Sequence, residues 1–200
     1  MAHHLLFVTS AGNSGPALTT VGAPASLTDY AMTVGAFAAP STHCPIYSMR
    51  AQVPELHYTW SSRGPTQDGA QGVSVSAPGV AITAVPTATL QNNQLMNGTS
   101  MASPSAAGSV AVALSSINAD KLTEWSPASV KRAFMNSARS VPGLFLNETG
   151  YDILKILLAS SIDRNYLFSK VLKKKRKVVD LSKLTKSLKF LESPTELITI

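Results

Sequence analysis

The sequence predicts an α/β fold, and three observations support this prediction. Of the 200 residues, 44% are hydrophobic and 14% are charged, which is typical of a chain with a buried core. Short apolar runs rich in strand-forming residues occur at 5–9, 31–37, 73–79 and 80–85. Helical patterns follow at about 100–116 and 126–138. Two hundred residues are enough for one domain with a sizeable core.

The net charge of +6 is concentrated at one end of the chain. Residues 1–150 contain six Lys or Arg and six Asp or Glu, whereas 151–200 contain eleven Lys or Arg and five Asp or Glu. Residues 157–200 therefore read as a basic, helix-prone C-terminal tail, with a run of nuclear-localisation type at Lys173–Lys177. Such runs are usually solvated helix faces, so nucleic acid is not the expected partner.

The chain has one cysteine, Cys44, so neither an internal disulfide nor a cysteine-rich zinc site can form, and we expect no metal. The apolar run at 5–8 is too short for a secretory signal and lacks a basic segment before it. No stretch approaches the roughly 18–20 apolar residues of a membrane span. We therefore expect no contact with a membrane.

The first predicted strand, at 5–9, runs into a turn of small residues, Ser10–Pro16. Asn13 lies in this turn, and its side-chain amide could donate a hydrogen bond into a cleft. Asn is also common in turns because it tolerates left-handed backbone, so the turn alone assigns no chemistry. The strand predicted at 31–37 is expected in the core. Residues 38–58, with three prolines and Cys44, are expected to form an inserted surface segment.

The most informative stretch is Asn97–Pro104, in which Gly98-Thr99-Ser100 leads into an alanine-rich helix reaching about Ser116. A serine here lies at a helix N-terminus, where free N–H groups and the helix dipole favour developing negative charge. A serine nucleophile needs that environment, although a bare Gly-Thr-Ser can equally be a helix cap. Ser126 is predicted to cap a second helix.

The whole Asn97–Pro104 stretch resembles the serine motif of the subtilisin-like serine proteases, the subtilases of the S8 family. The segment Ser10–Gly15 resembles the part of these enzymes that supplies an oxyanion-hole asparagine. The resemblance implies a partial subtilisin-like fold, a three-layer doubly wound parallel sheet, with 1–156 forming the C-terminal half of the peptidase domain. It also implies that Ser100 is the nucleophile and that Asn13 and the Ser100 N–H bind the oxyanion.

The resemblance extends to substrate binding. It implies that Ser10, Ala11 and Gly12 form a wall of the pocket for the substrate's P1 side chain, and that Gly98 and Thr99 also contact substrate. It implies no cofactor. Several segments, including Tyr58–Pro65, resemble the tripeptidyl-peptidase II branch. That branch implies release of N-terminal tripeptides from peptides, homo-oligomers and a cytoplasmic location, although the basic run would permit a nuclear one.

The family's catalytic Asp and His have no counterpart in this sequence. No Asp precedes Asn13, and none of the four histidines stands in a His-Gly-Thr motif; they are His3, His4, His43 and His57. We expect His43 and His57 to lie on the surface. The chain alone is therefore predicted to be inactive, with an unpaired sheet edge that favours aggregation. The alternative is a non-catalytic fragment or truncated isoform that acts through oligomer contacts or its basic tail.

Overall fold

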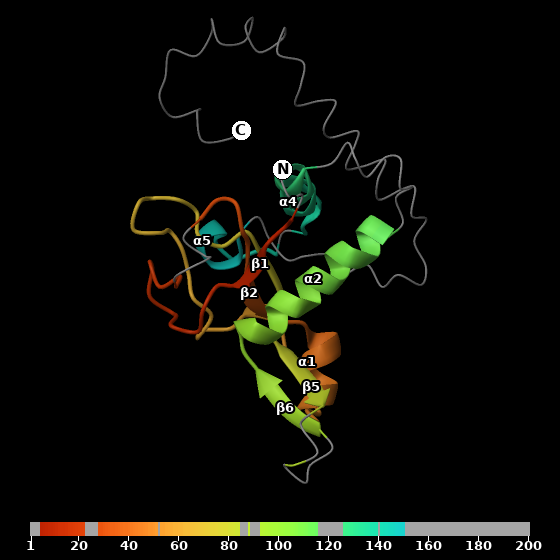
Figure 1. Ribbon diagram of the computed structural model, residues 1–200. Coiled ribbons are helices and arrows are strands. Elements are labelled where there is room, and N and C mark those ends of the chain that lie inside the picture. The colour runs from red at the N-terminus through yellow and green to blue at the C-terminus, as the bar shows by residue number, and fades with distance from the viewer. Residues whose placement is uncertain are drawn as a thin grey trace, which may run out of the picture. The chain divides into compact units, whose positions relative to one another are not determined.

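A computed structural model of the chain describes residues 5–22, 28–51, 53–84, 88, 93–115, 126–139 and 141–150. These residues form an α/β structure, as predicted (Figure 1). The helical tail predicted at 157–200, and the domain boundary before it, lie outside the described residues. No described helix is long and apolar enough to cross a membrane.

The central sheet has three parallel strands and one short antiparallel strand. They are β1 (Val8–Ser10), β2 (Met32–Ala38), β4 (Val75–Pro78) and the antiparallel β3 (Leu56–His57). β2 lies between β1 and β4, with Val34 opposite Ser10 on one side and Val75 on the other. β3 pairs with the end of β2, where His57 lies opposite Phe37. The sheet is thus parallel apart from β3.

The two faces of the sheet are covered by different elements, because side chains alternate along each strand. Helix α2 (Thr99–Ser115) packs on one face. The buried residues of that face and its helices form the main core: Met32, Val34, Ala36, Val75, Ala77, Ala102, Ala106, Val110 and Val130. On the other face, Phe37 packs with Val141, and the short helix α5 (Leu146–Thr149) contacts β2. The described part is therefore layered as helix, sheet and helix.

The segment at 38–58 is more deeply packed than predicted. It forms helix α1 (Pro40–Ile46) and strand β3, and Cys44 is buried. The prediction of a surface His57 is wrong, because this side chain is only 5% exposed. Pairing of β3 with β2 places His57 against the sheet beside Gly35, whose Cβ position would lie 3.0 Å from Nε2. His43 is half-buried.

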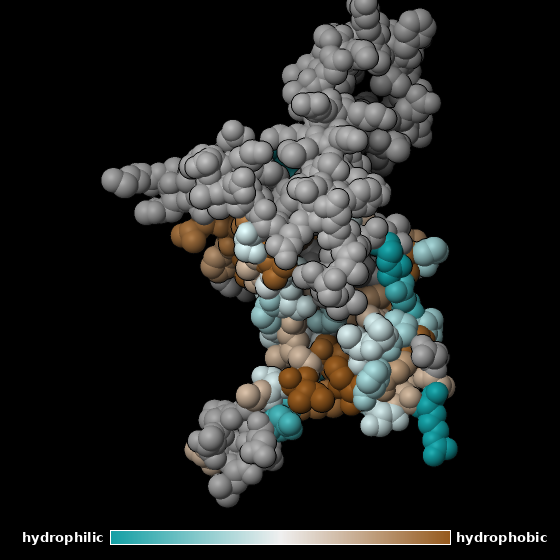
Figure 2. Space-filling view, turned by 90° about the vertical axis from the view of Figure 1, so that its right-hand side faces the viewer, coloured by the Kyte–Doolittle hydropathy of each residue, from teal (hydrophilic) through white to brown (hydrophobic). Residues whose placement is uncertain are grey.

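A two-stranded antiparallel ribbon leads into helix α2 and extends away from the sheet (Figure 1). It consists of β5 (Val80–Ala84), which was predicted, and β6 (Asn93–Asn97), which was not. All five residues of β6 are exposed, and so is Ile82, which lies opposite Leu95. Apolar surface is also visible in the lower half of the space-filling view (Figure 2). The ribbon ends at Asn97, the first residue of the serine motif.

Helix α4 (Pro127–Ser137) begins where the sequence predicts. The Ser126 hydroxyl accepts a hydrogen bond from the Ser129 N–H, and the Ser129 hydroxyl accepts one from the Ser126 N–H. This reciprocal arrangement satisfies two N–H groups at the helix start. Phe134 and Met135 of α4 pack against the main core.

Candidate active site

Ser100 lies in the first turn of helix α2. The carbonyl of Gly98 accepts hydrogen bonds from the N–H groups of Met101 and Ala102, at 3.1 and 3.4 Å, so the helix begins directly after the ribbon. Gly98 and Thr99 are buried, whereas Ser100 is exposed. N–H groups in a first helical turn have no acceptor within the helix, and the dipole makes this end positive. The serine therefore sits where negative charge is favoured.

Asn13 lies in the turn that follows β1. The turn is held by the segment around Ser62, whose N–H donates to the Gly12 carbonyl at 2.9 Å and whose Oγ accepts from the Ser14 N–H at 3.0 Å. The backbone of Gly12 has φ +104°, and a Cβ there would lie 2.9 Å from the Ser62 Oγ. Only glycine fits this position without displacing Ser62. Asn13 itself remains exposed.

Thr99 joins the asparagine turn to the start of the helix. Its N–H and its hydroxyl both donate to the Asn13 Oδ1, at 3.0 and 2.9 Å. The Thr99 Oγ1 in turn accepts from the Gly12 N–H at 3.2 Å. Because two donors occupy the amide oxygen, the orientation of the Asn13 amide is fixed and its two Nδ2–H donors point away from Thr99.

Gly98 lies close to those amide donors. A Cβ at this position would lie 3.5 Å from the Asn13 Nδ2, so glycine leaves the space beside the amide open. The structure thus brings together four of the predicted site residues, Asn13, Gly98, Thr99 and Ser100. A side-chain amide and a helix N-terminus beside a serine hydroxyl can stabilise an oxyanion that forms when the serine attacks a carbonyl carbon.

The residues predicted as a pocket wall occupy different environments. Ser10 is the last residue of β1 and is half-buried, as is Gly12 in the turn. Ala11 is fully buried and packs with Val21 and Val73. The structure therefore places the Ala11 side chain in the core and not on an open surface.

Sequence reasoning did not single out the residues that support this turn. The Ser61 Oγ accepts from the Ala36 N–H at 3.0 Å, which fixes the segment to β2, and the neighbouring Ser62 holds Gly12 and Ser14. Arg63 forms a 2.6 Å ion pair with Glu148 at α5. The serine pair in Trp60-Ser61-Ser62-Arg63 was the available signal, because two buried hydroxyls in one turn need backbone partners.

The described histidines, His43 and His57, are not hydrogen-bonded to Ser100. No His or Asp side chain in the described part of the chain is hydrogen-bonded to Ser100. The His43 Nδ1 is 2.7 Å from the Tyr58 hydroxyl oxygen. Neither ring nitrogen of His57 has a hydrogen-bond partner within the described ranges. Burial, with the positive charge of Arg63 adding to it, lowers the pKa of His57 to about 4.

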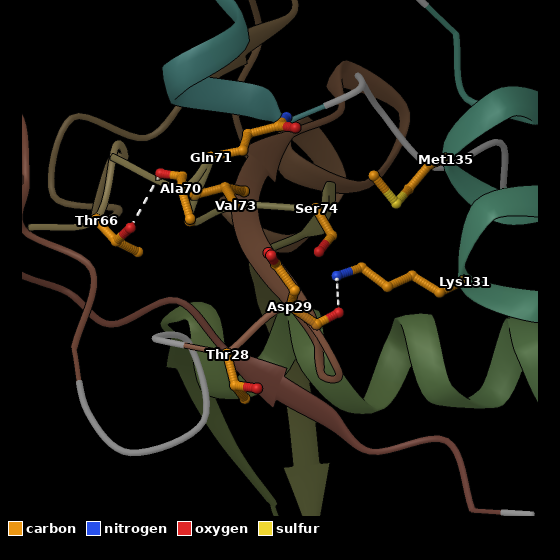
Figure 3. Close-up of a pocket in the computed structure, with 10 residues that line it drawn as sticks. Thr28, Asp29, Thr66, Ala70, Gln71, Val73, Ser74, Lys131 and Met135 are labelled. Carbon is orange, nitrogen blue, oxygen red and sulfur yellow. Dashed lines mark hydrogen bonds between the residues drawn. The ribbon is translucent and has the colours of Figure 1, made fainter. Parts of the chain in front are cut away.

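A pocket lies apart from this site, at the start of β2 and beside α4 (Figure 3). None of the predicted site residues lines it. The Lys131 Nζ donates to the Asp29 carbonyl at 2.8 Å, which ties α4 to the turn before β2, and burial lowers the pKa of Lys131. Across the residues that can be described, no cluster of three His, Cys, Asp or Glu side chains could hold a metal ion.

Comparison with known proteins supports the same family. Residues 1–153 match the model of the subtilase family of S8 peptidases. Tripeptidyl-peptidase 2 of Arabidopsis thaliana is 54% identical over 141 residues, covering 70% of this chain and 10% of the relative. Tripeptidyl-peptidase 2 of Caenorhabditis elegans is 41% identical, covering 84% of this chain and 12% of the relative. The chain thus spans about a tenth of the length of these relatives.

Solved structures agree with the sequence relatives. The crystal structure of tripeptidyl peptidase 2 is 35% identical with a TM-score of 0.55, covering 84% of this chain and 12% of that one. The prenylagaramide maturation protease PagA has the same fold, with a TM-score of 0.56 at 23% identity, covering 82% of this chain and 50% of that one. The chain belongs to the subtilase family of serine peptidases.

Proposed function

We propose that this chain carries the nucleophile and the oxyanion hole of a peptide-hydrolysing subtilase site. Ser100 attacks the scissile carbonyl, and the Asn13 Nδ2 and the Ser100 N–H donate to the oxyanion. The observation that carries the proposal is the pair of hydrogen bonds from Thr99 to the Asn13 Oδ1. That pair orients the amide donors before substrate arrives, which is how an oxyanion hole stabilises developing charge without reorganisation.

A serine nucleophile also needs a general base and a group that orients the base. His43 and His57, the described histidines, are engaged with Tyr58 or buried, so we place the base outside the described residues. We therefore expect the 200-residue chain alone not to turn over peptides. Joined to a subtilase segment that supplies Asp and His, the same residues should form a complete site.

A chimera tests this proposal. Residues 5–150 of this chain replace the matching segment of Arabidopsis tripeptidyl-peptidase 2, and the product is assayed for amide hydrolysis and for labelling by a fluorophosphonate. We expect activity and labelling that Ser100→Ala abolishes. Asn13→Ala should lower kcat by about 10²–10³ with a smaller change in KM, a range measured for the equivalent donor of a subtilisin.

Ser105→Ala is the matched control, because this serine lies one to two turns further along the same helix. It should leave both activity and labelling unchanged. An active chimera that keeps its activity after Ser100→Ala would overturn the assignment of the nucleophile. Equal kcat for Asn13→Ala and the unsubstituted chimera would overturn the assignment of the oxyanion donor.

We extend the proposal to the substrate. The relatives' name states that they release tripeptides, and we propose the same product for this site. Mass spectrometry of a chimera digest should show successive losses of three residues from a free N-terminus. N-acetylation of the same peptide should stop the reaction, and internal cleavage at equal rates with and without the acetyl group would contradict it.

Self-association and a cytoplasmic location complete the proposal. We expect the full-length protein that contains this segment to form homo-oligomers, which light scattering of the purified protein would detect. A fluorescent fusion would locate it, and a Lys173→Ala, Lys174→Ala, Lys175→Ala variant would show whether the basic run directs any of it to the nucleus.

A further inference from the structure

Residues 43–60 contain a polar aromatic network, defined here as His43, Tyr47, Tyr58 and Trp60, that no step above uses. The Tyr58 hydroxyl oxygen is 2.7 Å from the His43 Nδ1. The His43 ring packs against Tyr47 at 4.6 Å between centroids, and Tyr58 stacks on Trp60 at 4.5 Å with 20° between planes. Burial, and secondarily Tyr47, raises the pKa of Tyr58 to about 12, so its hydroxyl keeps its proton at neutral pH.

One end of the network reaches the serine side of the site. Tyr47 caps the C-terminus of α1, and its hydroxyl accepts a hydrogen bond from the Asn97 Nδ2 at 3.1 Å. Asn97 is the last residue of β6 and directly precedes Gly98, whose N–H donates to the Gly79 carbonyl at 2.9 Å. The hydrogen bond between the Asn97 side chain and Tyr47 therefore holds the link between β6 and helix α2, directly before Ser100.

The other end reaches the asparagine side. The Trp60 carbonyl accepts from the Gly15 N–H at 3.0 Å, two residues beyond Asn13, and Trp60 also packs against the main core. The contacts therefore form a closed ring from Asn13 through Thr99 to Asn97, and back through the polar aromatic network to Gly15. Thr99 joins the Asn13 turn to the start of helix α2 directly. The polar aromatic network joins the same two segments a second time, through Gly15 and Asn97.

We propose that Tyr47 is a positioning residue, whose hydroxyl fixes Asn97 and thereby sets the separation between Ser100 and the Asn13 amide. The proposal rests on the proposed function for its effect on catalysis. A hydrogen bond between neutral groups accounts for roughly a two- to tenfold effect. Loss of the Tyr47 hydroxyl should therefore lower kcat moderately and leave KM and folding nearly unchanged.

Tyr47→Phe tests this inference, because it removes only the hydroxyl and keeps the ring against His43. The variant is measured in two settings, the 200-residue chain and the chimera. In the 200-residue chain, nuclear magnetic resonance should show the Asn97 side-chain amide and the Gly98 and Thr99 N–H signals shifting. In the chimera described above, kcat should fall roughly two- to tenfold at constant KM. Tyr30→Phe is the control, because Tyr30 is 89% exposed, and it should change neither readout.

A double-substitution cycle with Asn97→Ala isolates the bond. The chimera carrying both Tyr47→Phe and Asn97→Ala should have the kcat of Asn97→Ala alone, because each change removes the same interaction. Additive losses, or Asn97 signals unmoved by Tyr47→Phe, would overturn the inference. If the unsubstituted chimera is inactive, the proposed function fails, and the magnetic resonance comparison in the 200-residue chain still decides whether Tyr47 holds Asn97.

Discussion

Strands β2 and β6 both support the candidate site, but in opposite environments. Every residue of β2 is buried, and its neighbour β1 leads to Asn13. Every residue of β6 is exposed, and it leads to Ser100. The turn with Asn13 therefore follows a strand of the central sheet, whereas Ser100 follows a surface ribbon. Substitutions in β2 should act mainly on folding, and those next to the ribbon mainly on the geometry of the site.

The largest expected difference between the two strands concerns stability. Phe37 in β2 is 2% exposed, and Phe37→Ala should lower the free energy of unfolding by about 3–5 kcal/mol, because it leaves a cavity. Leu95 in β6 is 42% exposed and lies opposite Ile82 across the ribbon. Leu95→Ala should cost at most about 1 kcal/mol. Urea denaturation of the 200-residue chain measures both, and equal losses would contradict the comparison.

The second expected effect is a dependence of stability on pH that comes from β3, the strand paired with β2. The pKa of His57 falls from 6.5 to about 4 on folding, because burial penalises the charged ring. The unfolded chain therefore binds the proton first as the pH falls. The stabilisation is complete above about pH 6.5 and is lost between there and pH 4, by roughly 3 kcal/mol in total.

Denaturation midpoints measured between pH 7 and 4 check this slope. His57→Asn removes the titrating ring and should flatten the profile over that interval, even if it also lowers stability at pH 7. A profile for His57→Asn as steep as that of the unsubstituted chain would assign the acid sensitivity to other groups. No comparable slope is expected from the ribbon, whose described residues include no ionisable side chain.

The smallest effect is expected at Thr99, where the ribbon and the core meet. Thr99→Val keeps the shape but removes the hydroxyl that donates to Asn13 and accepts from Gly12. The free energy of unfolding should fall by about 1 kcal/mol. Thr83→Val in β5 is the control, because the exposed Thr83 hydroxyl donates to the adjacent Ala84 carbonyl and not to a distant segment among the described residues, and the stability of this variant should be unchanged. Equal effects would mean that the Thr99 hydroxyl contributes nothing specific.

The sequence alone predicted the elements whose signals are local. Ser126-Pro127 marked the start of α4, and the apolar run at 31–37 marked β2. β6 was missed because its sequence, Asn93–Asn97, is largely polar and owes its strand to pairing with β5. The burial of His57 could not be predicted either, because it follows from pairing of β3 with β2 and not from any neighbouring residue.

At the candidate site too, the sequence predicted what local motifs indicate and missed what depends on contacts between distant segments. The motifs predicted that Asn13 and Ser100 belong together, and the structure brings their segments together through Thr99. The supporting roles of Ser61, Ser62 and Tyr47 depend on contacts between segments distant in sequence. The roles of Ser100 as nucleophile and of Asn13 as oxyanion donor stay predictions until the chimera is assayed.

The hydrogen bonds between Asn13 and Thr99 also have a kinetic meaning. They join residues separated by 86 positions, so the chain must close a long loop before they form. Contacts of such high sequence separation slow folding and form once the intervening strands have assembled. A nascent or partly unfolded chain therefore carries Ser100 without the contacts that place Asn13 beside the helix, so the proposed oxyanion site would arise only together with the finished sheet.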